Sequence, residues 1–171
     1  MIKVITGMRR CGKSTLMMMF RDEIISSGVD SEKTYYMNLG DELDNTISTP
    51  RELVDDIKSR LTPGKGNYVF LDEVQNVDGW ERAVESLYIH GTDIYIAGSD
   101  SHMLSSEMST KLSGRCVEIE VLPLSLSEYL QFRNVYNPDA SINEKFSDYI
   151  HWGGLPTTAL MSGSRIDLIS I

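Results

Sequence analysis

The sequence has 171 residues, 41% of them hydrophobic, and carries a formal net charge of −9 with a pI near 4.8. This length can bury one sizeable core, so we expect one domain with at most the start of a second. The acidic balance argues against a broad contact with a nucleic-acid backbone. No stretch approaches the roughly 18 apolar residues of a membrane span. Two distant cysteines favour a reducing, cytoplasmic setting.

The first informative stretch is GMRRCGKSTL, which begins at Gly7 and matches the pattern G-x-x-x-x-G-K-[ST]. It follows the apolar run IKVIT at residues 2–6, which is typical of a buried strand. After it, Leu16, Met19, Phe20 and Ile24 recur at spacings that predict one core-facing side of a helix. The order strand, glycine loop, helix predicts a phosphate-binding loop.

The residue types of this loop suit a phosphate tail. Gly7 and Gly12 let the main chain wrap closely around the β-phosphate, and the helix that starts near Lys13 directs its positive dipole end toward it. We expect Lys13 to reach the β- and γ-phosphates, Ser14 to bind Mg²⁺, and Thr15 to contact the α-phosphate or cap the helix. The expected nucleotide-binding set is Gly7, Met8, Arg9, Arg10, Cys11, Gly12, Lys13, Ser14, Thr15 and, from a later strand, Ser99.

Strand-like and helix-like segments then alternate. We predict strands at 34–39, 67–75, 93–100 and 116–124, and helices at 50–61, 80–90 and 101–112. Repeated strand–helix units imply a parallel sheet covered by helices on both faces. Ligands of such sheets bind beyond the carboxyl ends of the strands.

The stretch YVFLDE places two carboxylates at the carboxyl end of a buried strand. On its own this pattern also describes an ordinary strand end. Downstream of a phosphate loop, however, it predicts that Asp72 holds Mg²⁺ and that Glu73 orients or deprotonates the attacking water.

Two later positions have alternative interpretations. Ser99 and Asp100 end the strand DIYIAGSD, where they either sense the γ-phosphate or cap the next helix. Arg115 precedes the last predicted strand, and it either neutralises charge on a γ-phosphate of its own or a neighbouring subunit or forms a surface salt bridge.

Taken together, these segments resemble the bacterial and archaeal AAA-type ATPases that join an N-terminal P-loop domain to a poorly understood C-terminal domain. ITGMRRCGKSTL is similar to their Walker A segment, VFLDEVQNVDGWERAV to their Walker B segment, and IAGSDSHMLSSEMSTKLSGR to their sensor region. VEIEVLPLSLSEYLQF and the later GGLP resemble further signatures of that family.

The resemblance implies an α/β P-loop NTPase fold of the AAA/ASCE type, in which a parallel sheet lies between two helical layers. It also implies ATP hydrolysis with Mg²⁺, with Asp72 at the metal, Glu73 as catalytic base, Lys13 at the phosphates and Arg115 as a candidate arginine finger. The sensor stretch reads GSD where GSN or GSS is expected, so Ser99 is a better phosphate sensor than Asp100.

We therefore expect a P-loop ATPase core over residues 1–135 and a helical extension over 136–171 that leads to a C-terminal region absent from this chain. The expected ligands are ATP and ADP, and a homo-oligomer is an open alternative. A second functional hypothesis is a nucleotide-dependent switch with negligible hydrolysis of its own. A small-molecule kinase is disfavoured because no arginine-rich lid follows the phosphate loop.

Overall fold

The structure is a computed structural model that describes residues 1–40, 47–98, 112 and 114–160. Contacts divide the chain into two compact units. The first contains Met1–Gly7 and Lys13–Val121, and the second contains Met8–Gly12 and Leu122–Ile171. The boundary between the two units therefore lies between Val121 and Leu122. The expected domain boundary at residue 135 stays a prediction. Each unit is described by itself below.

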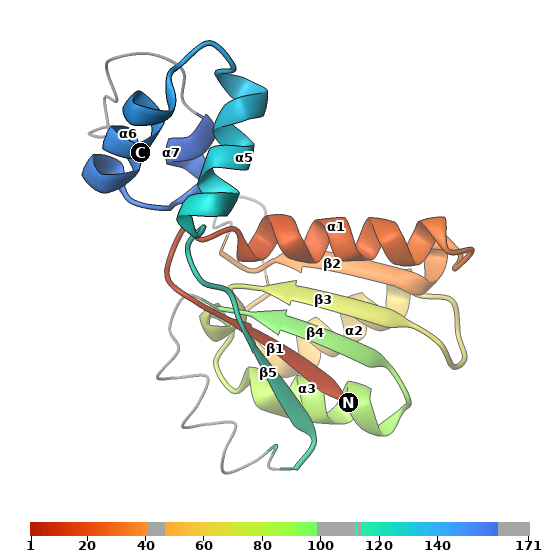
Figure 1. The fold of residues 1–171 in the computed structure, drawn as a ribbon. Coiled ribbons are helices and arrows are strands. Elements are labelled where there is room, and N and C mark those ends of the chain that lie inside the picture. The colour runs from red at the N-terminus through yellow and green to blue at the C-terminus, as the bar shows by residue number, and fades with distance from the viewer. Residues whose placement is uncertain (41–46, 99–111, 113, 161–171) are drawn as a thin grey trace. The chain divides into compact units, whose positions relative to one another are not determined.

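The first unit is built on a five-stranded parallel sheet with the order β2-β3-β4-β1-β5. The strands follow the apolar runs of the sequence, because a strand buried on both faces needs hydrophobic side chains on both. Figure 1 shows helices on both faces of the sheet, so the expected α/β P-loop NTPase-like fold is confirmed. The strands are β1 Ile2–Thr6, β2 Thr34–Asn38, β3 Tyr68–Asp72, β4 Asp93–Ala97 and β5 Cys116–Glu120.

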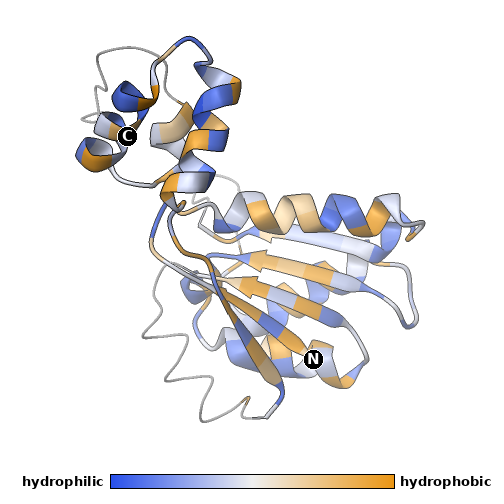
Figure 2. Cartoon of the chain, viewed as in Figure 1, coloured by the Kyte–Doolittle hydropathy of each residue, from blue (hydrophilic) through white to orange (hydrophobic). Residues whose placement is uncertain are grey.

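Helix α1, Lys13–Ser26, covers one face of the sheet, and α2, Pro50–Arg60, and α3, Trp80–Ile89, cover the other (Figure 1). Successive side chains of β3 point to opposite faces of the sheet. Phe70 points into the cluster that contains Met17 of α1, whereas its neighbours in β3 join the larger cluster that contains the buried side chains of α2 and α3. The colouring of Figure 2 shows how strongly hydrophobic residues concentrate in the central strands.

The predicted core face of α1 is wrong at three of its four positions, because only Ile24 is buried. Met17 is buried, at 1% exposure, whereas Leu16, Met19 and Phe20 are 42%, 64% and 43% exposed. The run LMMMF is apolar around the whole helix, so its periodicity favoured no single face. The burial of Lys13 sets the orientation of α1 about its own axis. A helix that buries this residue also buries the positions one and three turns later, which are Met17 and Ile24.

Most predicted elements are confirmed, although several are shorter than expected. β3 ends at Asp72 because Glu73 adopts a left-handed backbone conformation, and the short 3₁₀ helix Val74–Asn76 follows at once. Helix α2 begins at Pro50 as predicted, and Thr49 and Glu52 close a capping box at its start. The predicted helix 101–112 lies outside the described residues apart from Leu112.

The described residues of the second unit form three helices, each preceded by polar or turn-forming residues. Ser125 with Glu128 and Ser141 with Glu144 form capping boxes at the starts of α5, Leu126–Tyr136, and α6, Ile142–Trp152. The last helix, α7, covers Pro156–Leu160.

Two family signatures of the sequence meet in this unit. The amide of Leu124, in VLPL, donates to the carbonyl of Gly154, in GGLP, at 2.7 Å. Tyr149 donates from its hydroxyl to the Leu124 carbonyl at 3.2 Å. A Cβ on Gly154 would lie only 2.2 Å from that same carbonyl oxygen, so no side chain fits there. The glycine is therefore required by close backbone approach.

We expect Gly154→Ala to lower the free energy of unfolding by about 2–4 kcal/mol, because the methyl group would force two backbone segments apart. The control is Gly153→Ala, whose φ of 76° carries a strain of about 1 kcal/mol but whose Cβ would meet nothing within 4 Å. Urea denaturation followed by far-UV circular dichroism measures both. Equal losses for the two variants would contradict the steric argument.

Candidate functional site

The candidate site lies at the carboxyl edge of the sheet. β4 pairs with both β1 and β3, so one strand separates the loop after β1 from the carboxylates that end β3. At the usual strand spacing this places the two strand axes about 10 Å apart. Parallel pairing therefore brings Gly7, where the predicted phosphate loop begins, and the pair Asp72 and Glu73 to the same edge of the first unit.

Lys13 is the buried cation of this edge. It begins α1 with 5% exposure, and its Nζ donates to the carbonyl of Gly7 at 2.9 Å. Gly7 and Gly12 have φ values of 141° and 103°, which glycine adopts without strain. The lysine amine thus lies against the start of the loop, where it donates to a neutral carbonyl. A hydrogen bond to a phosphate oxygen would be stronger, because that acceptor is ionised.

The residues between these glycines form a tight turn. The amide of Cys11 donates to the carbonyl of Met8 at 3.3 Å, and the buried Cys11 fills space as the small residue expected there. Arg10 has a φ of 68°, a left-handed conformation that is uncommon outside glycine. Arg9 and Arg10 are exposed, and Gly12 lies near Pro156, which a Cβ on Gly12 would approach to 3.7 Å.

Ser14 and Thr15 lie in the first turn of α1 and are exposed. The first turn contains no acidic residue. The positive dipole end of α1 therefore meets no carboxylate from its own first turn, which favours an anion at this end.

Asp72 is the buried carboxylate of the edge, at 1% exposure. Its Oδ1 accepts from the amide of Glu73 at 3.0 Å. Its Oδ2 is buried and has no hydrogen-bond partner among the described residues. An ionised oxygen buried in this way is costly unless a cation or a donor meets it. A hard oxygen ligand at a carboxyl edge fits Mg²⁺, which binds proteins through one or two carboxylates and retains waters.

Tyr36 of β2 neighbours this carboxylate. Burial raises the pKa of the Tyr36 phenol to about 12, and the negative charge of Asp72 and hydrogen bonding of the phenol to its carboxylate add to the shift. Sequence reasoning missed Tyr36, because only the register of β2 against β3, which pairs Asn38 with Asp72, brings it to the site.

Glu73 directly follows β3 in a left-handed conformation, with φ 50° and ψ 44°. Its Oε2 accepts from Nε2 of Gln75 at 2.5 Å. Non-glycine residues in this region cost about 1–2 kcal/mol, and such strain concentrates at functional sites. Sequence reasoning missed Gln75 as well. Its position two residues after Glu73 is the signal that could have found it, because a side-chain amide so close in the chain can reach the carboxylate.

With this geometry in place, comparison with known proteins identifies the family. Residues 1–130 match the model of a family described as an AAA domain. The chain belongs to the AAA domain family. Membership implies nucleotide binding by this domain.

The AAA domain also matches two curated proteins. One, an uncharacterized protein of Haemophilus influenzae, is 37% identical over 161 residues, or 93% of this chain and 40% of that protein. The other, an uncharacterized protein of Methanocaldococcus jannaschii, is 33% identical over 177 residues, or 96% of this chain and 38% of that protein. The chain thus spans about two fifths of the length of these relatives.

The structure places Arg115 of the AAA domain away from the phosphate loop of its own chain. It precedes β5, where its carbonyl accepts from the amide of Ile2 at the start of β1. The loop follows the other end of β1, about 15 Å farther along a five-residue strand. The guanidinium pairs with Glu85 at 2.8 Å. This exposed ion pair matches the alternative interpretation of Arg115 as a surface salt bridge, and its role at a γ-phosphate stays a prediction.

The remaining predicted site residues, Ser99 and Asp100, lie outside the described residues. Within the described ranges no helix is long and apolar enough to cross a membrane.

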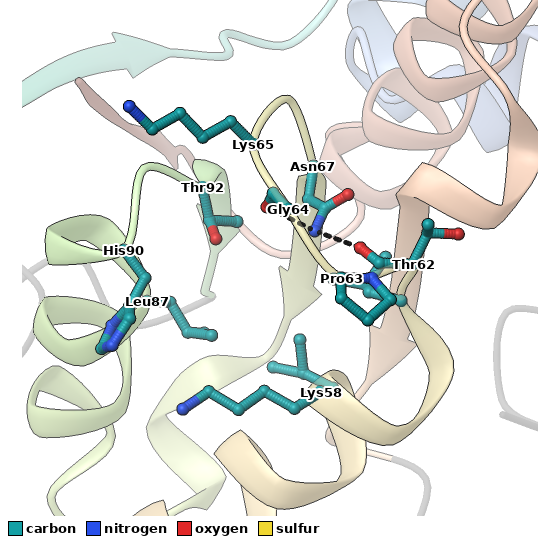
Figure 3. A pocket seen from close by; sticks show the side chains of 11 residues that line it. Lys58, Thr62, Pro63, Gly64, Lys65, Asn67, Leu87, His90 and Thr92 are labelled. Carbon is teal, nitrogen blue, oxygen red and sulfur yellow. Dashed lines mark hydrogen bonds between the residues drawn. The ribbon is translucent and has the colours of Figure 1, made fainter.

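A cavity of about 490 Å³ lies at the opposite edge of the sheet (Figure 3). It is lined by the end of α2, the loop before β3 and the end of α3, and Lys58 and Lys65 extend at its rim. None of the predicted phosphate-binding residues that the structure describes lines it.

The charge of Asp72 can be tested through its neighbour Tyr36. Replacing Asp72 by Asn removes a negative charge that disfavours the phenolate, so we expect the pKa of Tyr36 to fall from about 12 toward 10. Because the folded-state pKa lies above the unfolded one, the phenol stabilises the fold below pH 10, and this contribution is lost as pH rises through about 12. Ultraviolet titration, with Tyr36→Phe to assign the signal, measures the shift. An unchanged pKa in Asp72→Asn would contradict the proximity of the two groups.

Proposed function

We propose that this AAA domain binds ATP with Mg²⁺ and hydrolyses it at the carboxyl edge of its sheet. The observation that carries the proposal is the buried Oδ2 of Asp72, without a hydrogen-bond partner among the described residues, at the same edge as the loop that bears Lys13. An unmatched carboxylate oxygen beside a phosphate loop suits a cation bound together with a polyphosphate.

In this proposal the residues of the loop bind the triphosphate. Lys13 exchanges the carbonyl of Gly7 for β- and γ-phosphate oxygens, and backbone amides of residues 7–15 donate to the phosphates. The hydroxyl of Ser14 and the carboxylate of Asp72 would hold Mg²⁺. Bound Mg²⁺ supplies positive charge that favours the charge distribution of phosphoryl transfer.

Glu73 is the proposed base. As the oxygen of a water attacks the γ-phosphorus, the carboxylate accepts a proton from that water, and the bond between the γ-phosphorus and the bridging oxygen breaks toward ADP. Lys13 stabilises the charge that develops on the leaving oxygens. Glu73 belongs to the same sheet edge as the loop, which supports this role.

A second proposal keeps the same site but assigns it to a switch. Here ATP binding changes contacts with another part of a longer protein or with a partner, and hydrolysis by the domain alone is negligible. The length of the curated relatives favours a partner within the same polypeptide, such as a C-terminal domain. Both proposals include assembly of the protein into a homo-oligomer and a cytoplasmic location.

Binding and hydrolysis should be separable by mutation. We expect Lys13→Ala to abolish ATP binding, because it removes the buried cation of the loop, and Glu73→Gln to bind ATP but lose at least about 100-fold in hydrolysis. Calorimetry with Mg-ATP and phosphate release from the full-length protein measure the two effects. Lys58→Ala and Glu23→Gln are controls at exposed positions. Parent-rate hydrolysis by Glu73→Gln would overturn the assignment of the base, and slow turnover by the parent itself would favour the switch.

The position of Arg115 leaves a role at the site of a neighbouring subunit. If it acts there, Arg115→Ala should lower hydrolysis by about 1,000-fold with little effect on ATP binding. Mixing full-length Arg115→Ala with Glu73→Gln should then restore part of the rate, because some interfaces combine an intact Glu73 with an intact Arg115. Loss of rate that mixing never restores would argue against action between subunits.

A further inference from the structure

The conformation of Glu73 requires support from its surroundings. A glutamate with a φ of 50° carries a Cβ in a region that glycine favours, and no side-chain capping bond accompanies it. Such conformations persist only where neighbouring contacts over-determine them. The contacts around Glu73 therefore identify the groups that determine where its carboxylate points.

The first support acts on the carboxylate. Gln75 donates from Nε2 to Oε2 of Glu73 at 2.5 Å. Gln75 belongs to the 3₁₀ turn Val74–Asn76, which is anchored by the fully buried Val74 and Val77. The amide therefore projects from a rigid turn, and hydrogen bonds to an ionised acceptor are stronger than neutral ones.

The second support acts on the hydrocarbon part of the side chain. A Cβ on Gly40 would lie 3.2 Å from both Cβ and Cγ of Glu73, so the backbone of Gly40 packs closely against them. The segment that holds Gly40 is joined to the end of β3 by hydrogen bonds. The amide of Leu39 donates to the carbonyl of Asp72 at 2.8 Å, and Nδ2 of Asn76 donates to the carbonyl of Leu39 at 3.3 Å.

We propose that Gln75 is a positioning residue for hydrolysis, which fixes the orientation of the Glu73 carboxylate by donating to Oε2. The inference rests on the proposed role of Glu73 as the base. The backbone of Gly40 packs against the hydrocarbon part of Glu73, and the Gln75 amide restrains rotation of the carboxylate about its terminal bonds. A base displaced by about 1 Å can lose about 100-fold in rate, so this restraint matters for turnover rather than for nucleotide affinity.

Two variants of similar size test the proposal in the full-length protein. Gln75→Glu removes the donor and adds a negative charge, and Gln75→Met removes the donor without adding charge. We expect both to lower kcat for phosphate release by about 10-fold to 100-fold while the Kd for Mg-ATP changes less than about 2-fold. Asp78→Asn, at an exposed position beyond the same turn, is the control and should match the parent.

Glu73→Gln is measured in parallel so that the two ideas fail separately. If it loses hydrolysis while both Gln75 variants keep the parent kcat, the role of Gln75 is overturned and the base assignment stands. If Glu73→Gln hydrolyses ATP at the parent rate, the base assignment fails, and the role of Gln75 fails with it. A loss of ATP binding and of thermal stability in both Gln75 variants would also overturn the proposal, because it would show that Gln75 only maintains the fold.

Discussion

The parallel pairing of β1, β4 and β3 is the constraint on which the rest of this protein depends. Each strand presents its carboxyl end at one edge, so Thr6 and Asp72, which end β1 and β3, lie at the same edge with only β4 between their strands. The same pairing directs the amino ends, the loop before β3 and the ion pair of Arg115 with Glu85 to the opposite edge. The predicted phosphate loop and Arg115 therefore lie at opposite ends of β1 within one chain.

The site concentrates features that reduce stability. Lys13 and Asp72 are charged groups with 5% and 1% exposure, and Arg10 and Glu73 adopt left-handed conformations. Burial of charged groups and backbone strain are both unfavourable in the folded state. They are offset by the clusters on the two faces of the sheet, where Phe70, Trp80 and Met17 are almost fully buried. The packed core on both faces of the sheet thus supports these unfavourable features at its carboxyl edge.

The similarity to the curated relatives extends into the second unit, beyond the residues that the family model matches. The family match ends at residue 130, within α5, whereas the curated relatives align over 161 and 177 residues. The GGLP segment therefore belongs to what this chain shares with longer proteins. Its glycine has a physical reason in the close approach of Leu124 to Gly154.

The sequence by itself determined the order of strands and helices, the P-loop fold and the residues that were expected at the phosphates and the metal. Those features depend on local signals: apolar runs, a glycine spacing with a lysine, and a carboxylate pair at the end of a strand. Only the tertiary structure decided which face of α1 is buried, because LMMMF is apolar all around. It also decided that Arg115 lies at the far edge and that Tyr36, Gly40 and Gln75 surround Asp72 and Glu73. Those arrangements follow from strand register and from turns that pack against each other, and no local spacing encodes a contact between segments that are distant along the chain.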